Sequence, residues 1–394
     1  MRKAGLLSII TATALMASGY KIPETSSNAV ALGAATIAHN HENADASYYN
    51  PAKMVFMKDT NHLEVNLMYI GLDKIKYEGT VSGAGPSTWN LESEKEDFLV
   101  PSLHYVSPKL GDNGARIGVS VVVPGGLSKR WQSVPANNFA EEFSLEIVEI
   151  NPTVAFQVTD KLGFAFGFRV IDTKGVVNNA YYDMEGDSTD YGYNLALAYQ
   201  PTSDLELGLT YRSNINLNVN GTTTKVLAGN NGGVDVSVPL PAALSVAAAY
   251  TLPSDTTIEV VYEKTFWSAY NSLDFSFEDP TANIALGNSI EKDWKDTNAF
   301  RLGVTQELTD LTIMAGLVID QTSAPERTVG FELPGTDTRS VALGGRYKIN
   351  ETFDFGVSAL YSVHKSRTVQ NDTLDGEFTE GNVLLVSAGL GYKF

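Results

Sequence analysis

The chain has 394 residues, a formal charge of −18 and no cysteine. It offers no basic stripe that could neutralise phosphates, so no nucleic-acid partner is expected. The absence of cysteine excludes a disulfide framework and cysteine-ligated metal sites. The mean hydropathy of −0.09 does not exclude a membrane protein, because a spanning barrel alternates lipid-facing and lumen-facing side chains.

The N-terminus has the organisation of a secretory signal peptide. A cationic start at residues 1–3 precedes an apolar run at 4–16, and small residues follow at 17–19. Cleavage after Ala17 and cleavage after Gly19 both fit this pattern. We predict a signal peptide at residues 1–19 and export of the protein, with a short buried helix as the alternative.

Residues 20–57 differ from everything that follows them. The segment is rich in small residues, contains Pro23 and Pro51, and shows neither a helical stripe nor sustained alternation. A compact, irregular segment ahead of a long β-array needs a place to pack. We predict that it is a hatch that plugs the lumen of a barrel formed by residues 58–394.

From about residue 61 to the C-terminus, apolar side chains recur at every second position. The clearest runs are Leu205–Tyr211, Leu311–Ile319, Phe353–Val363 and Leu384–Phe394. Period-two patterning over eight or so residues indicates strands with two different environments.

Short turns and long polar connections alternate between these strands. The short ones lie at 107–114, 159–161, 200–204, 252–255, 308–310 and 349–352, and the long ones at 80–94, 125–142, 221–233, 278–290, 322–336 and 366–377, with a shorter member at 181–185. This is the pattern of periplasmic turns and outer loops, and it gives about fourteen strands. The predicted fold is all-β, an antiparallel transmembrane β-barrel plugged by the N-terminal hatch.

Aromatic side chains gather near the predicted strand ends. Tyrosines lie on the short-turn side, at Tyr105, Tyr199, Tyr250, Tyr347 and Tyr392. Trp267 and Trp294 flank a long loop on the other side, so the pattern predicts two aromatic girdles at the membrane interfaces. The terminal Phe394 is typical of the signal that the outer-membrane assembly machinery reads.

Motifs along most of the chain resemble one known family. They are Gly19–Glu24, Ser26–Ser27, Gly33–Ala35, Asn43–Asp45, Asn50–Ala52, Leu240–Pro241, Trp267, Asp293–Asp296, Arg301–Gly303, Leu333–Arg339 and Gly344–Tyr347. In this order they resemble the FadL/TodX outer-membrane transporters of long-chain fatty acids and hydrocarbons. The loops at 125–142 and 221–233 do not match, and loops are where ligand capture varies.

The resemblance implies a fourteen-stranded, hatch-plugged barrel in the outer membrane of a Gram-negative bacterium, in contact with its lipid and lipopolysaccharide. It implies passive uptake of long-chain fatty acids, or of aromatic or alkane hydrocarbons. Ligand would be caught by outer loops, bound in an inner pocket and released sideways through the barrel wall. In the family the side opening lies at a kink in the third strand, which corresponds here to about 114–124. We expect a monomer.

A carboxylate ligand would need a cation in the lumen. The wall candidates are Arg169, Arg212, Arg301 and Arg346, whose sequence neighbours are apolar. The alternative is that these arginines pair with acids such as Glu206, Glu259 and Glu263 and tie strands together. Tyr20 and Ile22 are ligand candidates by resemblance, because the start of the hatch lines the family's inner pocket.

Pro23 and the Asn50–Pro51–Ala52 motif are the candidate hatch or gate residues. Proline fixes φ, removes a donor and pushes the preceding residue towards an extended conformation. Asn50 can then bond backbone across to the wall. This arrangement fits a gate and a simple anchor equally well.

No catalytic, cofactor-binding or metal-binding site is predicted, and we expect no enzyme activity. The chain has no G-x-S-x-G, Walker or H-E-x-x-H motif, and His39 and His41 resemble a solvated turn more than a metal site. Two other classes stay open: an open porin for small hydrophilic solutes, and a surface adhesin or structural barrel.

Overall fold

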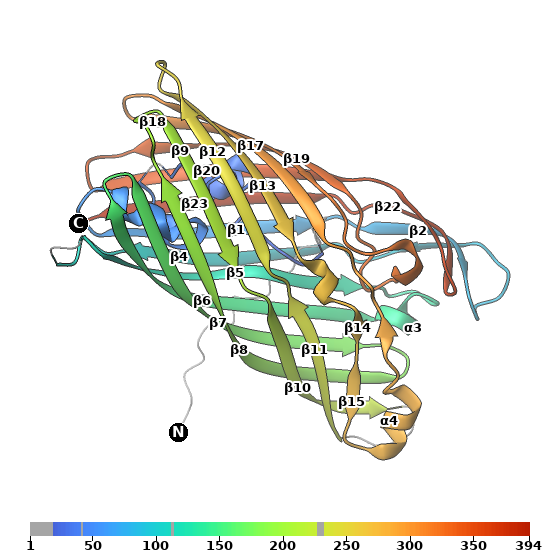
Figure 1. Ribbon diagram of the computed structural model, residues 1–394. Coiled ribbons are helices and arrows are strands. Elements are labelled where there is room, and N and C mark those ends of the chain that lie inside the picture. Colours follow the sequence, from blue (N-terminus) through green and yellow to red (C-terminus); the bar gives the residue numbers. More distant parts are fainter. Residues whose placement is uncertain (1–18, 41, 112–113, 227–231) are drawn as a thin grey trace, which may run out of the picture.

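The computed structural model describes residues 19–394 except 41, 112–113 and 227–231. In this part of the chain, fourteen antiparallel crossings close into one barrel (Figure 1), as predicted. In order around the wall they are β1 (His62–Leu72), β4 (Glu96–Val106), β5 (Arg116–Arg130), β6 (Glu142–Thr159), β7 (Leu162–Asn178), β8 (Tyr182–Tyr199), β9 (Leu205–Arg212) with β10 (Ile215–Val226), β12 (Ala243–Thr251) with β11 (Gly232–Leu240), β13 (Thr256–Thr265), β17 (Thr297–Glu307), β18 (Leu311–Asp320), β19 (Thr338–Lys348), β20 (Phe353–His364) and β23 (Val383–Lys393). β1 pairs with both β4 and β23, which closes the cylinder.

Some crossings are built from more than one strand segment. β9 and β10 both pair with β8 and are separated at Ser213 and Asn214. β11 and β12 are separated at Pro241, which lacks the N–H that a continuous ladder needs. β15 (Phe275–Phe277) pairs with β11 and so continues the crossing that β13 begins.

The predicted alternation along the strands is confirmed. Leu343 on β19 is 63% exposed and faces outwards, whereas its neighbour Ala342 is buried and faces the lumen. The tyrosine girdle at the short-turn end is also confirmed, because Tyr199, Tyr250 and Tyr347 are exposed there. An apolar outer wall edged by tyrosines suits a bilayer.

The predicted tryptophan girdle at the loop end is wrong. Trp267 and Trp294 are 0% and 3% exposed and point into the mouth of the barrel. Exposed aromatic residues of the wall include Phe168 on β7 and Tyr191 and Tyr193 on β8. The rings of Phe168 and Tyr191 stack with centroids 5.8 Å apart.

The long loops carry their own secondary structure. β2 (Ile75–Val81), β3 (Trp89–Glu92), β21 (Arg367–Gln370) and β22 (Leu374–Glu380) form a four-stranded sheet, and β14 (Ser272–Leu273) pairs with β16 (Ile290–Glu291). The short helices of the loops are α3 (Asn137–Ala140), η2 (Trp267–Ala269), α4 (Pro280–Leu286) and η3 (Glu326–Thr328). They lie at the right-hand end of Figure 1, opposite the C-terminus. The polar composition of these loops gave no sign of this second sheet.

Residues 19–57 lie inside the barrel, and their helices lie in its short-turn half (Figure 1). They form α1 (Ser27–Leu32), α2 (Ala46–Tyr49) and the 3-10 helix η1 (Pro51–Phe56). The Ser26 hydroxyl caps α1 by accepting from Ala29 N at 3.1 Å, and Gly33 ends it with a φ of +57°. Among the described residues, no helix is long and apolar enough to cross a membrane. The predicted signal peptide lies outside the described residues apart from Gly19, so the division into leader, hatch and barrel stays a prediction.

Glycines of the wall stand where the lumen segment touches it. A Cβ on Gly316 of β18 would lie 2.3 Å from the Leu32 carbonyl carbon, and one on Gly163 of β7 would lie 2.4 Å from Ala52 O. At Gly208 of β9 the nearest atom would be Ile37 O, at 2.6 Å. The backbone of residues 19–57 therefore packs directly on the backbone of the wall.

We predict that Gly316→Ala destabilises the protein by about 1–3 kcal/mol, because the added methyl overpacks the contact with Leu32. The matched control is Gly175→Ala on β7, where the nearest atom to a new Cβ lies 3.7 Å away. Thermal unfolding in detergent, followed by loss of β circular dichroism, measures both. Equal midpoints for the two variants would contradict the tight fit at Gly316.

Candidate functional site

The barrel wall is incomplete between its second and third crossings. β4 and β5 pair only from Val106–Gly118 to Leu103–Val121. A bulge between Val122 and Gly125 then shifts the register of β5 against β6. Contact resumes at the outer end, where Glu94 N donates to Arg130 O at 2.9 Å. The interval between these contacts is called the β4–β5 gap below.

Two prolines account for the position of the gap. Ser107 N donates to Ile117 O at 2.8 Å, so the odd-numbered amides of β4 point towards β5. Pro101 is also odd-numbered, but it has no N–H to donate to β5, so it cannot continue the ladder. Pro124 lies within the bulge of β5, where proline is tolerated in a sheet.

The start of the hatch lies against β5 at the gap. Ile22 N donates to Pro124 O at 2.9 Å, and Gly126 N donates to Tyr20 O at 2.8 Å. Lys21 and Gly125 form an isolated antiparallel bridge. The hatch thus supplies β5 with backbone partners where β4 does not.

The lumen beside the gap is apolar. Ile22 belongs to a buried apolar cluster. The other members come from the hatch and from β1, β4, β5, β19, β20 and β23. They are Val30, Met68, Ile70, Leu72, Phe98, Val100, Val123, Ala342, Leu360, Val383 and Leu385. Lumen-facing side chains of aqueous barrels are polar. These residues, called the apolar column below, favour a ligand that avoids water.

Most of the predicted ligand residues border one internal cavity. It measures about 70 Å3, and its lining includes Ile22, Pro23, Arg169, Arg212 and Arg301. Tyr20 lines a separate apolar cavity of about 30 Å3 on the loop side, and Arg346 lies elsewhere, at the short-turn end. The structure therefore brings together four of the six predicted ligand residues, with the predicted gate residue Pro23 beside them.

Arg169 and Arg212 share one buried acid. Arg169 Nε and Nη2 donate to the two oxygens of Glu149 at 3.1 and 3.0 Å, and Arg169 Nη1 donates to Ser213 O at 2.8 Å. Arg212 also donates to Glu149, and its guanidinium carbon lies 4.3 Å from the centre of the Tyr48 ring. Both guanidinium groups therefore have a partner, and the single carboxylate of Glu149 balances one of their two positive charges.

Arg301 and Arg346 are also paired. Arg301 Nη1 donates to Gly33 O at 3.0 Å and lies 3.6 Å from Glu24, while Nη2 lies 3.5 Å from Glu263. Arg346 donates to Asp354, and to Glu64 at 2.8 Å. Of the three acids named as partners from the sequence, only Glu263 pairs with one of these arginines. The pairs nevertheless match the structural alternative, in which arginines tie elements together.

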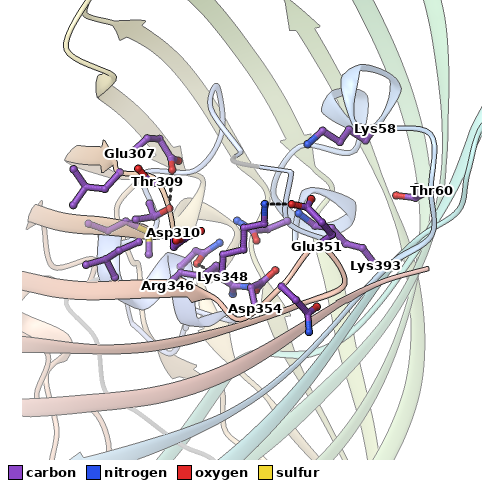
Figure 2. A pocket seen from close by; sticks show the side chains of 17 residues that line it. Lys58, Thr60, Glu307, Thr309, Asp310, Arg346, Lys348, Glu351, Asp354 and Lys393 are labelled. Carbon is purple, nitrogen blue, oxygen red and sulfur yellow. Dashed lines mark hydrogen bonds and ion pairs between the residues drawn. The ribbon is translucent and has the colours of Figure 1, made fainter.

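Arg346 borders a polar cavity at the short-turn end, which Figure 2 shows from close by. The cavity measures about 350 Å3. Lys348 Nζ donates to Glu351 at 2.6 Å, and Thr312 Oγ1 donates to Glu307 at 2.7 Å, both drawn as dashed lines (Figure 2). A cavity lined by cations, anions and neutral polar groups suits water better than an apolar ligand.

Glu206 and Glu259 hold the hatch. Glu259 accepts from the backbone N–H groups of Ile37, Ala38 and His39, at 2.8, 2.7 and 3.1 Å. Glu206 contacts both His39 Nδ1 and Lys53 Nζ. His39 is therefore tied to the wall, and its interpretation as a solvated turn is wrong; His41 lies outside the described residues.

Asn50 links the hatch to the wall as its motif predicted. Its side-chain Nδ2 donates to Ile37 O at 2.8 Å and to Leu197 O of β8 at 3.1 Å, and its Oδ1 accepts from Ala52 N at 3.2 Å. Its φ of −148° is extended, and Pro51 begins η1, where its missing N–H leaves no bond unmade.

Tyr20 closes the lumen towards the loops. Its hydroxyl donates to Pro239 O, and its ring lies edge-on to Trp267 with centroids 4.9 Å apart. Trp294 and Tyr270 complete this aromatic cluster, at 6.1 and 6.5 Å from Tyr20. Trp267 and Trp294 were assigned to the membrane surface from sequence, and only their place in the resembling motifs hinted at the lumen.

A wide groove of about 610 Å3 opens among the outer loops above this cluster. Its apolar lining includes Phe139, Phe143, Tyr181, Tyr182, Leu273, Phe275, Leu286, Ile290 and Phe331. Phe143, Leu273 and Phe275 also line the apolar cavity beside Tyr20, so the groove and the cavity adjoin.

A closed barrel with a filled lumen, an apolar internal column and an interrupted wall defines a plugged membrane channel. Comparisons with known proteins give the family. Residues 8–394 match the family model described as outer membrane protein transport protein (OMPP1/FadL/TodX). The chain belongs to this family, as the resemblance predicted.

Relatives and solved structures agree along nearly the whole chain. Outer membrane protein P1 of Haemophilus influenzae is 23% identical over 473 aligned positions that cover 100% of both chains. A long-chain fatty acid transport protein of Salmonella typhi is 21% identical and covers 98% of this chain and 96% of its own. The fold is similar to that of a Pseudomonas aeruginosa FadL homologue, with a TM-score of 0.83, 18% identity, and coverage of 95% of this chain and 99% of the other. It is also similar to that of the Pseudomonas putida toluene transporter TodX, with a TM-score of 0.71, 16% identity, and coverage of 94% of this chain and 98% of the other. The protein is placed in the outer membrane of a Gram-negative bacterium.

We predict that Asn50→Ala loosens the hatch by about 1–3 kcal/mol, because it removes the side-chain hydrogen bonds to Ile37 O and Leu197 O. Limited proteolysis of folded barrels and single-channel conductance measure the effect. If Asn50 is an anchor, the variant should be cleaved faster within residues 20–57. If Asn50 is a gate, the variant should open to ions more often without faster cleavage. The control is Asn220→Ala, because the side-chain Nδ2 of Asn220 donates to Asn218 O on the outer face at 2.9 Å. A variant indistinguishable from wild type in both assays would refute both roles.

Proposed function

We propose that this protein takes up hydrophobic small molecules passively, with long-chain fatty acids as the main substrates. The observation that carries the proposal is the apolar column around Ile22, which lies at the β4–β5 gap. A water-filled pore would not help an apolar molecule that partitions poorly into water. Burial of about 25 cal/mol per Å2 of apolar ligand surface gives enough affinity for capture without energy coupling.

The route follows the cavities in order. Ligand is caught in the groove of the outer loops, passes the aromatic cluster around Tyr20 and reaches the cavity beside Ile22. It leaves sideways through the β4–β5 gap after the start of the hatch moves. In this scheme Tyr20 and Ile22 contact ligand, whereas Pro23 and Asn50–Ala52 set the position of the hatch.

Arg169, Arg212 and Arg301 stay candidates for contact with a carboxylate, since they border the same cavity as Ile22. Their ion pairs give each of them a structural role as well. Arg346 is the weakest of the four candidates, because it borders the polar cavity at the short-turn end.

Two observations bear on the substrate class. Relatives aligned over nearly the full length are named long-chain fatty acid transport proteins, which supports fatty acids. The alternative is an aromatic or alkane hydrocarbon, which the almost wholly apolar lining of the cavity at Tyr20 favours. The family consists of transport proteins, and we propose that this chain likewise catalyses no reaction.

The test is uptake and binding of labelled oleate and toluene, combined with conductance in planar bilayers. Full-length protein should bind and import oleate while conducting ions poorly, because residues 19–57 fill the lumen. Deletion of residues 20–57 should raise conductance several-fold and remove the selectivity for hydrophobic solutes. Free ion conduction by the full-length protein, without binding or import of either compound, would instead assign it to the open porins.

A further inference from the structure

A buried lysine lies at the outer edge of the β4–β5 gap. Lys129 of β5 is 1% exposed, and its ammonium Nζ has one polar neighbour, Ser93 Oγ, at 3.5 Å. No described carboxylate forms an ion pair with it. A charged group buried at membrane depth is costly unless it has a partner, so such groups commonly mark ligand paths.

Two further buried atoms near Lys129 lack hydrogen-bond partners among the described residues. One is Oε1 of Glu96 on β4, and the other is Nε2 of His364 at the end of β20. Lys129 and His364 interact electrostatically, which places them in the same region of the protein. Buried polar atoms are nearly always paired in native proteins, and unpaired ones need an explanation.

One oxygen of Glu96 is already engaged by other groups. Its Oε2 accepts from Ser128 Oγ and from Arg130 Nη1, the latter at 2.7 Å. Arg130 Nη2 in turn donates to Glu142 at 2.6 Å. Glu96 attracts the ammonium of Lys129 without forming an ion pair with it, so the ammonium can still bind a further anion.

These polar atoms stand at the outer end of the apolar column. Leu72 of that column is the strand partner of both Glu96 and Val383. Val383 pairs with Ser362, which is two residues before His364 on the same face of β20. From Leu72 the column continues along the gap through Phe98 and Val100 of β4 to Ile22. A cationic end followed by an apolar column has the polarity of a fatty acid.

We propose that Lys129 binds the carboxylate of a fatty acid whose hydrocarbon chain lies along Leu72, Phe98 and Val100 and replaces Ile22 there. The inference rests on the proposed uptake of hydrophobic molecules and specifies amphipathic carboxylates as its substrate class. The carboxylate supplies a close acceptor for the ammonium of Lys129, whose one described hydrogen bond is the long contact with Ser93 Oγ. The four arginines predicted from sequence differ, because each of them already pairs with an acid of the protein.

The experiment compares oleate with oleyl alcohol, which has the same chain and no charge. Binding of each to full-length protein in detergent is measured for wild type, Lys129→Met and Lys129→Arg, with Lys161→Met in an exposed periplasmic turn as the control. Heat-modifiable migration in gels verifies that each barrel is folded. Lys129→Met should weaken oleate binding by about tenfold or more and leave oleyl alcohol binding unchanged, because it removes one hydrogen bond to a charged group. Lys129→Arg should retain oleate binding, since it keeps the charge.

Oleate binding by folded Lys129→Met equal to that of wild type would overturn the assignment, and so would equal losses for both ligands. These results would leave the proposed uptake function intact. If wild type binds neither compound, the proposed function fails and the assignment fails with it.

Discussion

The structure depends on the requirement that backbone N–H and C=O groups inside a membrane find partners within the protein. Closure of the barrel meets this requirement along most of the described wall, but the ladder is interrupted at the β4–β5 gap, where Pro101 and Pro124 lie. There the first residues of the hatch take over, through the bonds from Ile22 N to Pro124 O and from Gly126 N to Tyr20 O. The plug and the opening are thus one arrangement, because moving the start of the hatch also uncovers the backbone of β5.

The rest of the hatch is tied to the wall at several further points. Wall glycines such as Gly316 and Gly163 allow direct backbone packing, and Glu259 accepts three consecutive backbone amides. Asn50 adds a bond to Leu197 O of β8. In the proposed route, ligand replaces the contacts of Tyr20–Ile22 while the helices behind them stay in place.

Much of the fold follows from the sequence, because period-two alternation and the spacing of turns act locally. The inward or outward direction of Leu343, Ala342 and the tyrosines at the short-turn end is set by strand parity alone. The partners of the lumen arginines depend on the register between crossings, so Glu149, Glu64 and Asp354 could not be identified in advance. Trp267 and Trp294 were misplaced because an aromatic residue near a strand end fits either a membrane interface or a packed mouth. The gap did have a local signal, namely prolines at 101 and 124 within strand patterns, which argue against a central position in a sheet.

The most direct test of the account is to staple the β4–β5 gap. Val100 of β4 and Val123 of β5 belong to the same buried cluster on either side of it, and the chain has no cysteine of its own. Val100→Cys combined with Val123→Cys therefore places one pair of thiols on the two sides of the gap, and oleate import by cells is measured with the pair oxidised and then reduced. We predict that import stops when the disulfide forms and returns on reduction. Equal import in both states, with the cross-link verified by mass spectrometry, would contradict exit through the gap.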